Sequence, residues 1–250
     1  MKFVNLFGHL KANIIGMIHV GALPGTPLSR AAVPELIDEA CREAEIYCHH
    51  GVDGLLIENM HDVPYVCTAG PEVGAVMTAV CSAVRKLHPS VPVGVQILAA
   101  ANQTALAVAL ASGMMNACAG ELLRYRKHMG AEHIQIFTDI KKKHSAHALT
   151  ADVSVAETAR AAEFFLSDGV IVTGPATGVQ ANPHELNDVL QFVSIPVLVG
   201  SGVTCDNLED YLEANALIIG SYFKKEGRWE NSVDPERVES FMEKVRELRK

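Results

Sequence analysis

Short apolar runs alternate with longer stretches of helical period along almost the whole chain. Seven runs are rich in Val and Ile and apolar on both faces, which is typical of parallel strands covered by helices. We expect these strands at Asn13–Val20, Gly54–Met60, Pro92–Leu98, His133–Ile140, Gly169–Gly174, Pro196–Val203 and Ala216–Phe223. Helices are expected at Val33–His50, Glu72–Leu87, Gln103–Ser112, Asn116–Met129, Val155–Ser167, Pro183–Val193, Asp206–Ala214 and Pro235–Lys250. This alternation predicts the α/β class and a TIM-type (β/α) barrel.

Several helix ends carry recognisable capping residues. Asn182 stands before Pro183, which places an N-cap ahead of a proline at the first helical position. Gly51, Gly113 and Gly130 each follow a predicted helix, where glycine adopts the left-handed conformation that ends a helix. The helix boundaries are therefore predicted by end signals as well as by period.

One strand of the usual eight is missing from this pattern. Two helical segments meet between Leu98 and His133, around Gly113, with no β-rich run between them. We expect seven strands and eight helices, with the fourth strand absent. Three explanations stay open: a barrel that is open or re-registered there, a shortened product of a longer protein, or one long helix kinked at Gly113.

Composition sets limits on the function classes. The 250 residues, 49% hydrophobic and 20% charged, fit one barrel domain over 1–250. The net charge of -8 argues against nucleic acid, because binding to phosphate backbones needs clustered Lys and Arg. No apolar run is long enough for a membrane span, and the six cysteines include no C-x-x-C pair. We expect a cytoplasmic protein without a cofactor, and a homo-oligomer is left open.

Polar residues gather where the predicted strands end, which is where barrel enzymes carry their chemistry. Unpaired burial of such groups costs about 2–7 kcal/mol each, so a purely structural strand end would not need them. The candidate catalytic residues are His19, Glu58, Gln96, Asp139 and Lys141. Glu58 and Asp139 are the general-base candidates, although structural pairing with Lys141 or His61 would also explain them. His61, His144 and His147 lack the spacing of a metal set, so no metal site is expected.

The strongest local signal is a pair of glycine turns late in the chain. Each turn follows an apolar strand, and glycine lets backbone N–H groups approach a phosphate closely. Loops after the last two strands hold the phosphate in many TIM-type barrels. The candidate phosphate-binding residues are Gly200, Ser201, Gly202, Gly220 and Ser221, together with Thr173 and Gly174 one strand earlier. The alternative, that glycine serves only the turn conformation, stays open.

Long segments of the chain resemble the BtpA/SgcQ family. The similar segments are Gly16–Pro27, Glu58–Met60, Asn116–Arg126, Ile136–His144, Ala162–Phe165 and Val199–Val203, so the resemblance covers nearly the whole chain. It implies a ribulose-phosphate-binding type of barrel and therefore a phosphorylated small-molecule ligand. It also implies that family members carry roughly twenty further residues between the positions of Gly113 and Asn116. At a rise of about 3.3 Å per residue, that length is consistent with one strand and its connections.

The resemblance leaves two classes of function open. Relatives in photosynthetic bacteria are associated with the accumulation of photosystem I, and another belongs to a carbohydrate-utilisation gene cluster. The first hypothesis is an enzyme acting on a phosphorylated sugar-like metabolite, with an isomerase- or epimerase-like reaction. The second is a non-enzymatic assembly or stability factor. A third is a nonfunctional variant that lacks the strand. Fold alone does not decide between them.

Overall fold

The computed structural model describes residues 2–66, 68–99, 101–112, 120–143 and 147–249. Within it the chain forms two compact units. Unit 1 comprises Met1–Ile15 and Ile136–Lys250, and unit 2 comprises Gly16–Gln135. The division falls inside the first strand, so that strand contributes residues to both units. The single domain expected over 1–250 stays a prediction.

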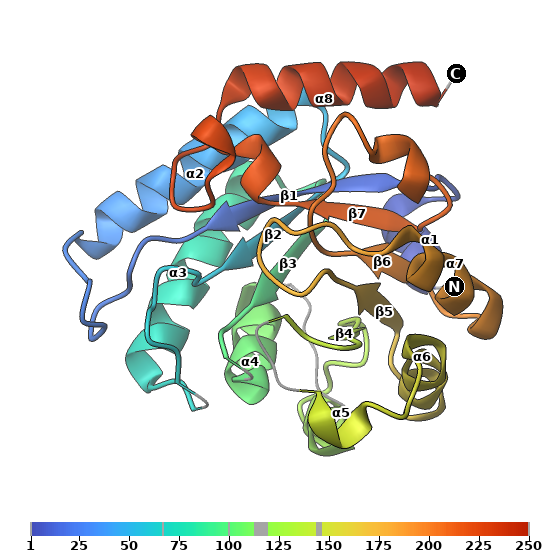
Figure 1. Ribbon diagram of the computed structural model, residues 1–250. Coiled ribbons are helices and arrows are strands. Elements are labelled where there is room, and N and C mark those ends of the chain that lie inside the picture. The colour runs from blue at the N-terminus through green and yellow to red at the C-terminus, as the bar shows by residue number, and fades with distance from the viewer. Residues whose placement is uncertain (1, 67, 100, 113–119, 144–146, 250) are drawn as a thin grey trace. The chain divides into compact units, whose positions relative to one another are not determined.

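Unit 1 contains the amino-terminal residues of the first strand and the four last strands of the chain. In sheet order these strands are β1, β7, β6, β5 and β4, and β4 to β7 run side by side in Figure 1. The recorded pairs are parallel, for example Val170 with Val197 and Leu198 with Ala216. The elements are α1 (Lys2–Phe7), β1 (Asn13–His19), β4 (Phe137–Asp139), α6 (Val155–Phe164), β5 (Gly169–Val172), α7 (Pro183–Phe192), β6 (Val197–Val199), β7 (Ala216–Ile219) and α8 (Pro235–Leu248).

Unit 2 contains the remaining residues of β1 with the next two strands and four helices. Its strands pair in parallel, with Leu55 opposite Val93 and Glu58 opposite Gln96. Helix α3 packs against α2 and against α4. The elements are α2 (Val33–His50), β2 (Gly54–Glu58), α3 (Pro71–Leu87), β3 (Val93–Gln96), α4 (Asn102–Ser112) and α5 (Gly120–His128). Each strand of this unit is therefore followed by a helix.

The local signals read from the sequence explain these elements. Strand residues such as Ile14, Ile57 and Leu217 are buried, as expected for strands with apolar residues on both faces. The side chain of Asn182 accepts a hydrogen bond of 2.9 Å from the N–H of His184 and caps α7. Gly51 ends α2 in the left-handed conformation with φ 83°. These two predicted caps are confirmed, Gly130 likewise follows α5 in the left-handed conformation with φ 65°, and Gly113 lies outside the described residues.

The predicted fold class is confirmed. The described residues form seven strands and eight α-helices, and most strands are followed by an α-helix, as in a TIM-type (β/α) protein. Between β3 and β4 the described residues contain α4 and α5 and no strand, as the sequence predicts. The helix kink proposed at Gly113, and the start of the predicted helix at Asn116, lie outside the described residues. Helix α5 itself is described from Gly120.

One predicted helix is wrong. The stretch Asp206–Ala214 forms only a short 3₁₀ helix at Leu208–Tyr211, and the eighth α-helix is instead α1 at Lys2–Phe7. Leu208 and Tyr211 are the buried residues of this turn, and a spacing of three matches the 3₁₀ repeat. The Tyr211 hydroxyl donates to the carbonyl oxygen of Ala181 at 2.5 Å, which holds the turn in place. A nine-residue stretch has too few buried positions to enforce an α-helix.

Candidate functional site

In unit 1 the loops that follow β5 and β6 touch backbone to backbone. The N–H of Gly174 donates to the Oγ atom of buried Ser201 at 2.7 Å. A Cβ atom on Gly174 would lie 2.3 Å from the carbonyl oxygen of Val179. A Cβ atom on Gly202 would lie 2.3 Å from the Cα and N atoms of Gln180, and Gly202 has φ +69°. Only glycine fits at these two positions without backbone movement.

The loop after β7 joins the same arrangement. Gly178 has φ +75°, and a Cβ atom there would lie 3.5 Å from the Oγ atom of Ser221. Segment 174–180 therefore borders Ser201 and Gly202 on one side and Ser221 on another. We call residues 173–182, 200–204 and 220–223 the glycine loops. The two late glycine turns lie side by side, at the carboxyl ends of neighbouring strands.

The glycine loops offer backbone donors for an anion. Within the residues that the structure describes, the amides of Gly202 and Ser221 donate to no protein acceptor. Gly220, with φ -105° and ψ -95°, turns the chain out of β7 into a short 3₁₀ helix at Ser221–Phe223. Unpaired amides at glycine-rich turns are the groups that bind phosphate oxygens in other proteins.

The end of β4 places charged residues beside these loops. The Lys143 ammonium donates to the carbonyl oxygen of Gly200 at 3.2 Å, and the Thr173 hydroxyl donates to the carbonyl oxygen of Lys141 at 3.3 Å. Asp139 is the last residue of β4 and is half-buried. Burial raises the pKa of the Asp139 carboxyl, and the positive charges of Lys143 and Lys142 oppose this shift. A carboxyl with a raised pKa is suited to proton transfer near neutral pH.

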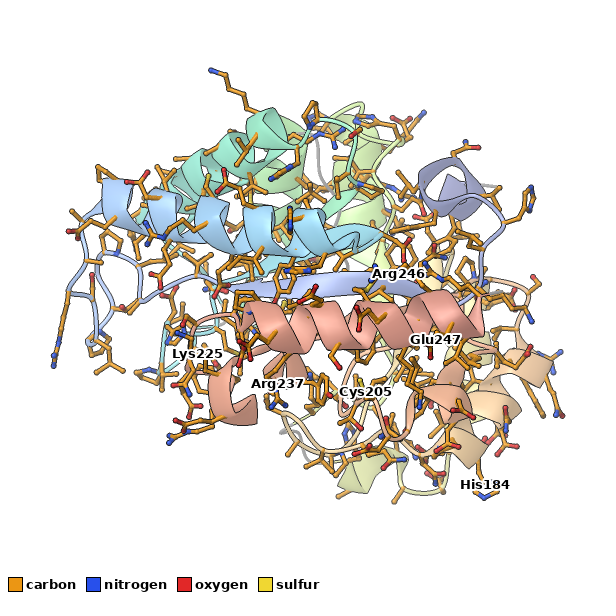
Figure 2. All side chains as sticks on the ribbon, turned by 90° about the horizontal axis from the view of Figure 1, so that it is seen from above. His184, Cys205, Lys225, Arg237, Arg246 and Glu247 are labelled. Carbon is orange, nitrogen blue, oxygen red and sulfur yellow. The ribbon has the colours of Figure 1, made fainter. Side chains whose placement is uncertain are left out.

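In unit 1, side chains of helix α8 donate hydrogen bonds to the segments that follow β6 and β7. Arg237 donates from Nε to the carbonyl oxygen of Tyr222 at 2.6 Å and lies 4.6 Å from the centre of the Tyr222 ring. Lys244 donates to the carbonyl oxygen of Cys205 at 2.7 Å. Figure 2 shows Arg237 on α8 and Cys205 along the same side of that helix. The segments that follow β6 and β7 are thus both tied to one rigid helix.

In unit 2 three candidate residues end three strands. His19 ends β1, Glu58 ends β2 and Gln96 ends β3, where Gln96 is the register partner of Glu58. The Nε2 atom of His19 lies 3.9 Å from an Oε atom of Glu58, and both side chains are almost fully buried. The N–H of Val20 donates to the carbonyl oxygen of Glu58 at 2.8 Å and ties β1 to β2 at this point. The pair is close enough for charge interaction and longer than a direct hydrogen bond.

A buried side-chain network begins at the residue that follows Glu58. Asn59 donates from Nδ2 to Asp62 at 2.8 Å and accepts the N–H of Leu98 at 2.7 Å. Asp62 also accepts the N–H of Leu23 at 2.8 Å. Burial raises the pKa of Asp62, and its hydrogen bonds from Leu23 and Asn59 lower it. Asn59 and Asp62 therefore anchor the segments that follow β1 and β3, and we call His19, Glu58, Asn59 and Asp62 the carboxylate cluster.

The structure distributes the twelve candidate residues over the two units. Nine lie at strand ends of unit 1: Asp139, Lys141, Thr173, Gly174, Gly200, Ser201, Gly202, Gly220 and Ser221. Three lie at strand ends of unit 2: His19, Glu58 and Gln96. Sequence reasoning missed Lys143, Asn59 and Asp62. The signal that could have found Asn59 and Asp62 is their position directly after a strand that ends in the candidate Glu58.

The described part of the chain contains neither a metal-ligand cluster nor a membrane-spanning helix. No group of three His, Cys, Asp or Glu side chains lies close enough together to hold a metal ion there. No helix among the described residues has the length and apolar character needed to cross a membrane.

The alternation of strand and helix, with polar residues at the strand ends, defines a TIM-type (β/α) protein. The chain belongs to the BtpA family, whose model matches residues 10–114 and 110–247. The two matched segments meet near the position of the missing strand. The break supports the prediction that family members have residues there that this chain lacks.

Relatives cover nearly the whole chain. An uncharacterized mitochondrial protein of Caenorhabditis elegans is 44% identical over 260 aligned positions, covering 95% of this chain and 94% of its own length. The photosystem I biogenesis protein BtpA of Synechocystis is 30% identical, covering 94% of this chain and 88% of its own length. The first alignment has more positions than the 250 residues of this chain, so the relative has residues without a counterpart here.

A solved structure shares the fold. The (S)-3-O-geranylgeranylglyceryl phosphate synthase from Thermoplasma acidophilum, solved in complex with its substrate sn-glycerol-1-phosphate, has a TM-score of 0.62 with this chain. It is 15% identical, and the match covers 98% of this chain and 97% of that chain. This likeness concerns the fold alone.

Proposed function

We propose that this protein is an enzyme acting on a phosphorylated, sugar-like small molecule, with the phosphate held by the glycine loops. The observation that carries the proposal is the contact of three loops in unit 1, through Gly174 with Ser201, Gly202 with Gln180, and Gly178 with Ser221. Loops of this kind after the last strands suit a phosphate. The phosphorylated substrate of the synthase with the same fold supports the same ligand class here.

The chemistry that we assign is proton transfer. Asp139 beside the glycine loops and Glu58 in the carboxylate cluster are the proposed acid and base. His19 and Gln96 would orient a carbonyl or hydroxyl group, and Lys141 would stabilise negative charge on an enediolate or a phosphate. An isomerase- or epimerase-like reaction uses these groups and needs no cofactor. The raised pKa of Asp139 supports its role, because proton transfer is efficient when the pKa approaches the working pH.

Titration calorimetry with inorganic phosphate and a panel of sugar phosphates tests the proposal. We expect binding by the wild-type protein and by the Glu58→Gln and Asp139→Asn variants, because neither residue belongs to the glycine loops. Turnover of the bound sugar phosphate should fall on the order of 100-fold or more in both variants. Unchanged turnover would remove Glu58 and Asp139 as acid and base. Absence of binding by the wild-type protein would overturn the proposal.

A second candidate function is that of a non-enzymatic assembly factor. The name of the Synechocystis relative, a photosystem I biogenesis protein, favours it. In that case the fold would serve as a scaffold, the glycine loops would be a vestige or a sensor, and no sugar phosphate would be turned over. Phosphate binding without turnover of any sugar phosphate in the panel would favour this second function.

We further propose a cytoplasmic location, because the cysteines show no C-x-x-C spacing or other disulfide framework. The nematode relative is described as mitochondrial, which provides the alternative. Fractionation of cells that express the full chain, with markers for both compartments, distinguishes the two.

A further inference from the structure

Four large apolar side chains lie exposed at the ends of α6 and α7 in unit 1. The exposed fractions are 78% for Phe164, 58% for Phe165, 70% for Leu166 and 51% for Phe192. The rings of Phe164 and Phe165 contact edge to face with centroids 5.3 Å apart. We call these four residues the aromatic patch. Single exposed apolar residues are common, but three in a row are not.

The two helix ends that carry the patch are tied together. The carboxylate of Glu163 accepts the N–H of Ser194 at 2.9 Å and its hydroxyl at 2.5 Å. Ser194 follows Phe192 by two residues, and α6 packs against α7. The patch is therefore one surface on a rigid pair of helices.

The packing of α6 against the rest of the unit does not require apolar residues at the patch positions. The buried residues of this helix are Val155, Ala156 and Ala159, so its period places Phe164 on the solvent side. The helix ends with Ser167 N–H bonded to the carbonyl of Ala162 and Leu166 N–H bonded to that of Glu163. Leu166 has φ 66°, in the left-handed position that glycine usually occupies. A leucine there costs about 1–2 kcal/mol relative to glycine, and its exposed side chain does not recover that cost through burial.

The size of the patch suits a protein interface. With about 200 Å² for a fully exposed aromatic side chain, the four residues expose about 500 Å² of apolar surface. This is near the upper range for a patch on a monomer. It is also more than half of the ~800 Å² that each partner contributes to a standard interface. Aromatic residues are enriched in the buried centre of such interfaces.

The charges around the patch favour a second copy of this chain. Arg160 lies about one turn before Phe164 and Asp188 about one turn before Phe192, and both are exposed. In a two-fold contact Arg160 of each copy can lie opposite Asp188 of the other copy, so this pair of charges is self-complementary. An anionic lipid surface would require several Lys or Arg residues, whereas the net charge of the chain is -8. We propose that the aromatic patch is the contact through which two copies of this chain form a dimer.

Sedimentation velocity over a concentration series tests this proposal. The wild-type protein should form a dimer that persists when salt is raised, because the contact is apolar. Phe164→Ser combined with Phe165→Ser should weaken self-association on the order of 100-fold or more. Phe192→Ser, on the other helix, should weaken it as well. Leu28→Ser, which changes an exposed leucine of unit 2, is the matched control and should leave the dimer intact.

Leu166→Gly provides an independent readout. It removes the left-handed leucine, so the melting temperature of the monomer should rise while self-association weakens. Circular dichroism of each variant checks that the fold is retained. A wild-type protein that stays monomeric at all concentrations would overturn the proposal, including the case in which it binds lipid vesicles instead. A dimer that persists in the Phe164 and Phe165 double variant would also overturn it.

Discussion

In unit 1 the strand ends are packed through glycines, whereas in unit 2 they are held by buried polar side chains. Gly174 and Gly202 bring two backbones together so closely that neither position has room for a Cβ atom. In unit 2, the side chains of Asn59 and Asp62 hold the loops by accepting the N–H groups of Leu98 and Leu23, respectively. The loops at the strand ends are thus held by close backbone packing in unit 1 and by side-chain hydrogen bonds in unit 2.

The difference indicates that the strand ends of the two units have different roles. Glycine loops keep backbone donors close to the surface with no side chain in front of them, which suits an anion such as a phosphate. The buried pair of Asn59 and Asp62 instead uses side-chain acceptors to hold the backbone after β1 and β3. Substitutions should therefore act through sterics in unit 1 and through unsatisfied hydrogen bonds in unit 2.

The largest effect is expected at Gly202. In Gly202→Ala the new Cβ atom would collide with the backbone of Gln180, and φ +69° is unfavourable for alanine. We expect a loss of about 3 kcal/mol or more in the free energy of unfolding, from strain and overpacking together. Phosphate binding measured by calorimetry should be lost even at temperatures where the variant is folded.

Gly8→Ala is the matched control for this substitution. Gly8 also lies in unit 1 and has φ +68°, but nothing lies within 4 Å of its Cβ position. It should cost only the backbone strain, about 1–2 kcal/mol, and leave phosphate binding unchanged. Denaturant unfolding of both variants separates the collision from the strain. Equal losses in the two variants would show that the contact with Gln180 has no energetic role.

The sequence was sufficient for the fold because its signals are local. Both strand-face apolar runs and end signals such as Asn182 with Pro183 depend on neighbouring residues only, and both are confirmed. The Asp206–Ala214 stretch failed because its outcome depends on a distant partner, the carbonyl oxygen of Ala181 that Tyr211 binds. A helical period in nine residues does not contain that information.

The candidate site was predictable to a similar extent. Strand ends are visible in the sequence, and this placed Glu58, Asp139 and the glycine turns on the candidate set. The contact of Lys143 with Gly200 was not visible, because it joins residues from loops that are 57 positions apart. The hydrogen bonds of Asn59 to Leu98 and of Asp62 to Leu23 each span 39 positions and escaped for the same reason.

A smaller effect is expected at Asn59 in unit 2. Asn59→Ala leaves the Leu98 N–H without its acceptor and removes one donor from Asp62, both in buried positions. We expect a loss of about 2–3 kcal/mol, measured by denaturant unfolding. Turnover should fall as well, because the segments after β1 and β3 lose their common anchor.

Asn59→Asp distinguishes lost hydrogen bonds from lost packing. A second carboxylate beside Asp62 would raise the pKa of the pair, so the folded protein would hold a proton that the unfolded chain releases. The stability of this variant should therefore be highest at acid pH and should be lost as the pH rises. A variant that is equally stable at acid and neutral pH would show that Asp62 has little contact with position 59.

The smallest effect is expected at Asp139. Burial raises the pKa of this carboxyl in the folded protein above the ordinary value of about 3.9. Between these two pKa values the folded state binds more protons than the unfolded chain, so the stability contributed by this group falls as the pH rises. Asp139→Asn removes that dependence. We expect the variant to match the wild type at acid pH and to gain less than about 1 kcal/mol at neutral pH, because the group is partly exposed to solvent. Thermal unfolding across the pH range measures this gain.

Asp206→Asn, which removes an exposed carboxylate of the same unit, is the control and should show no such gain. A neutral-pH loss of stability in Asp139→Asn would mean that Lys143 and Lys142 outweigh burial, and Asp139 would then be a structural ion-pair partner instead of an acid or base.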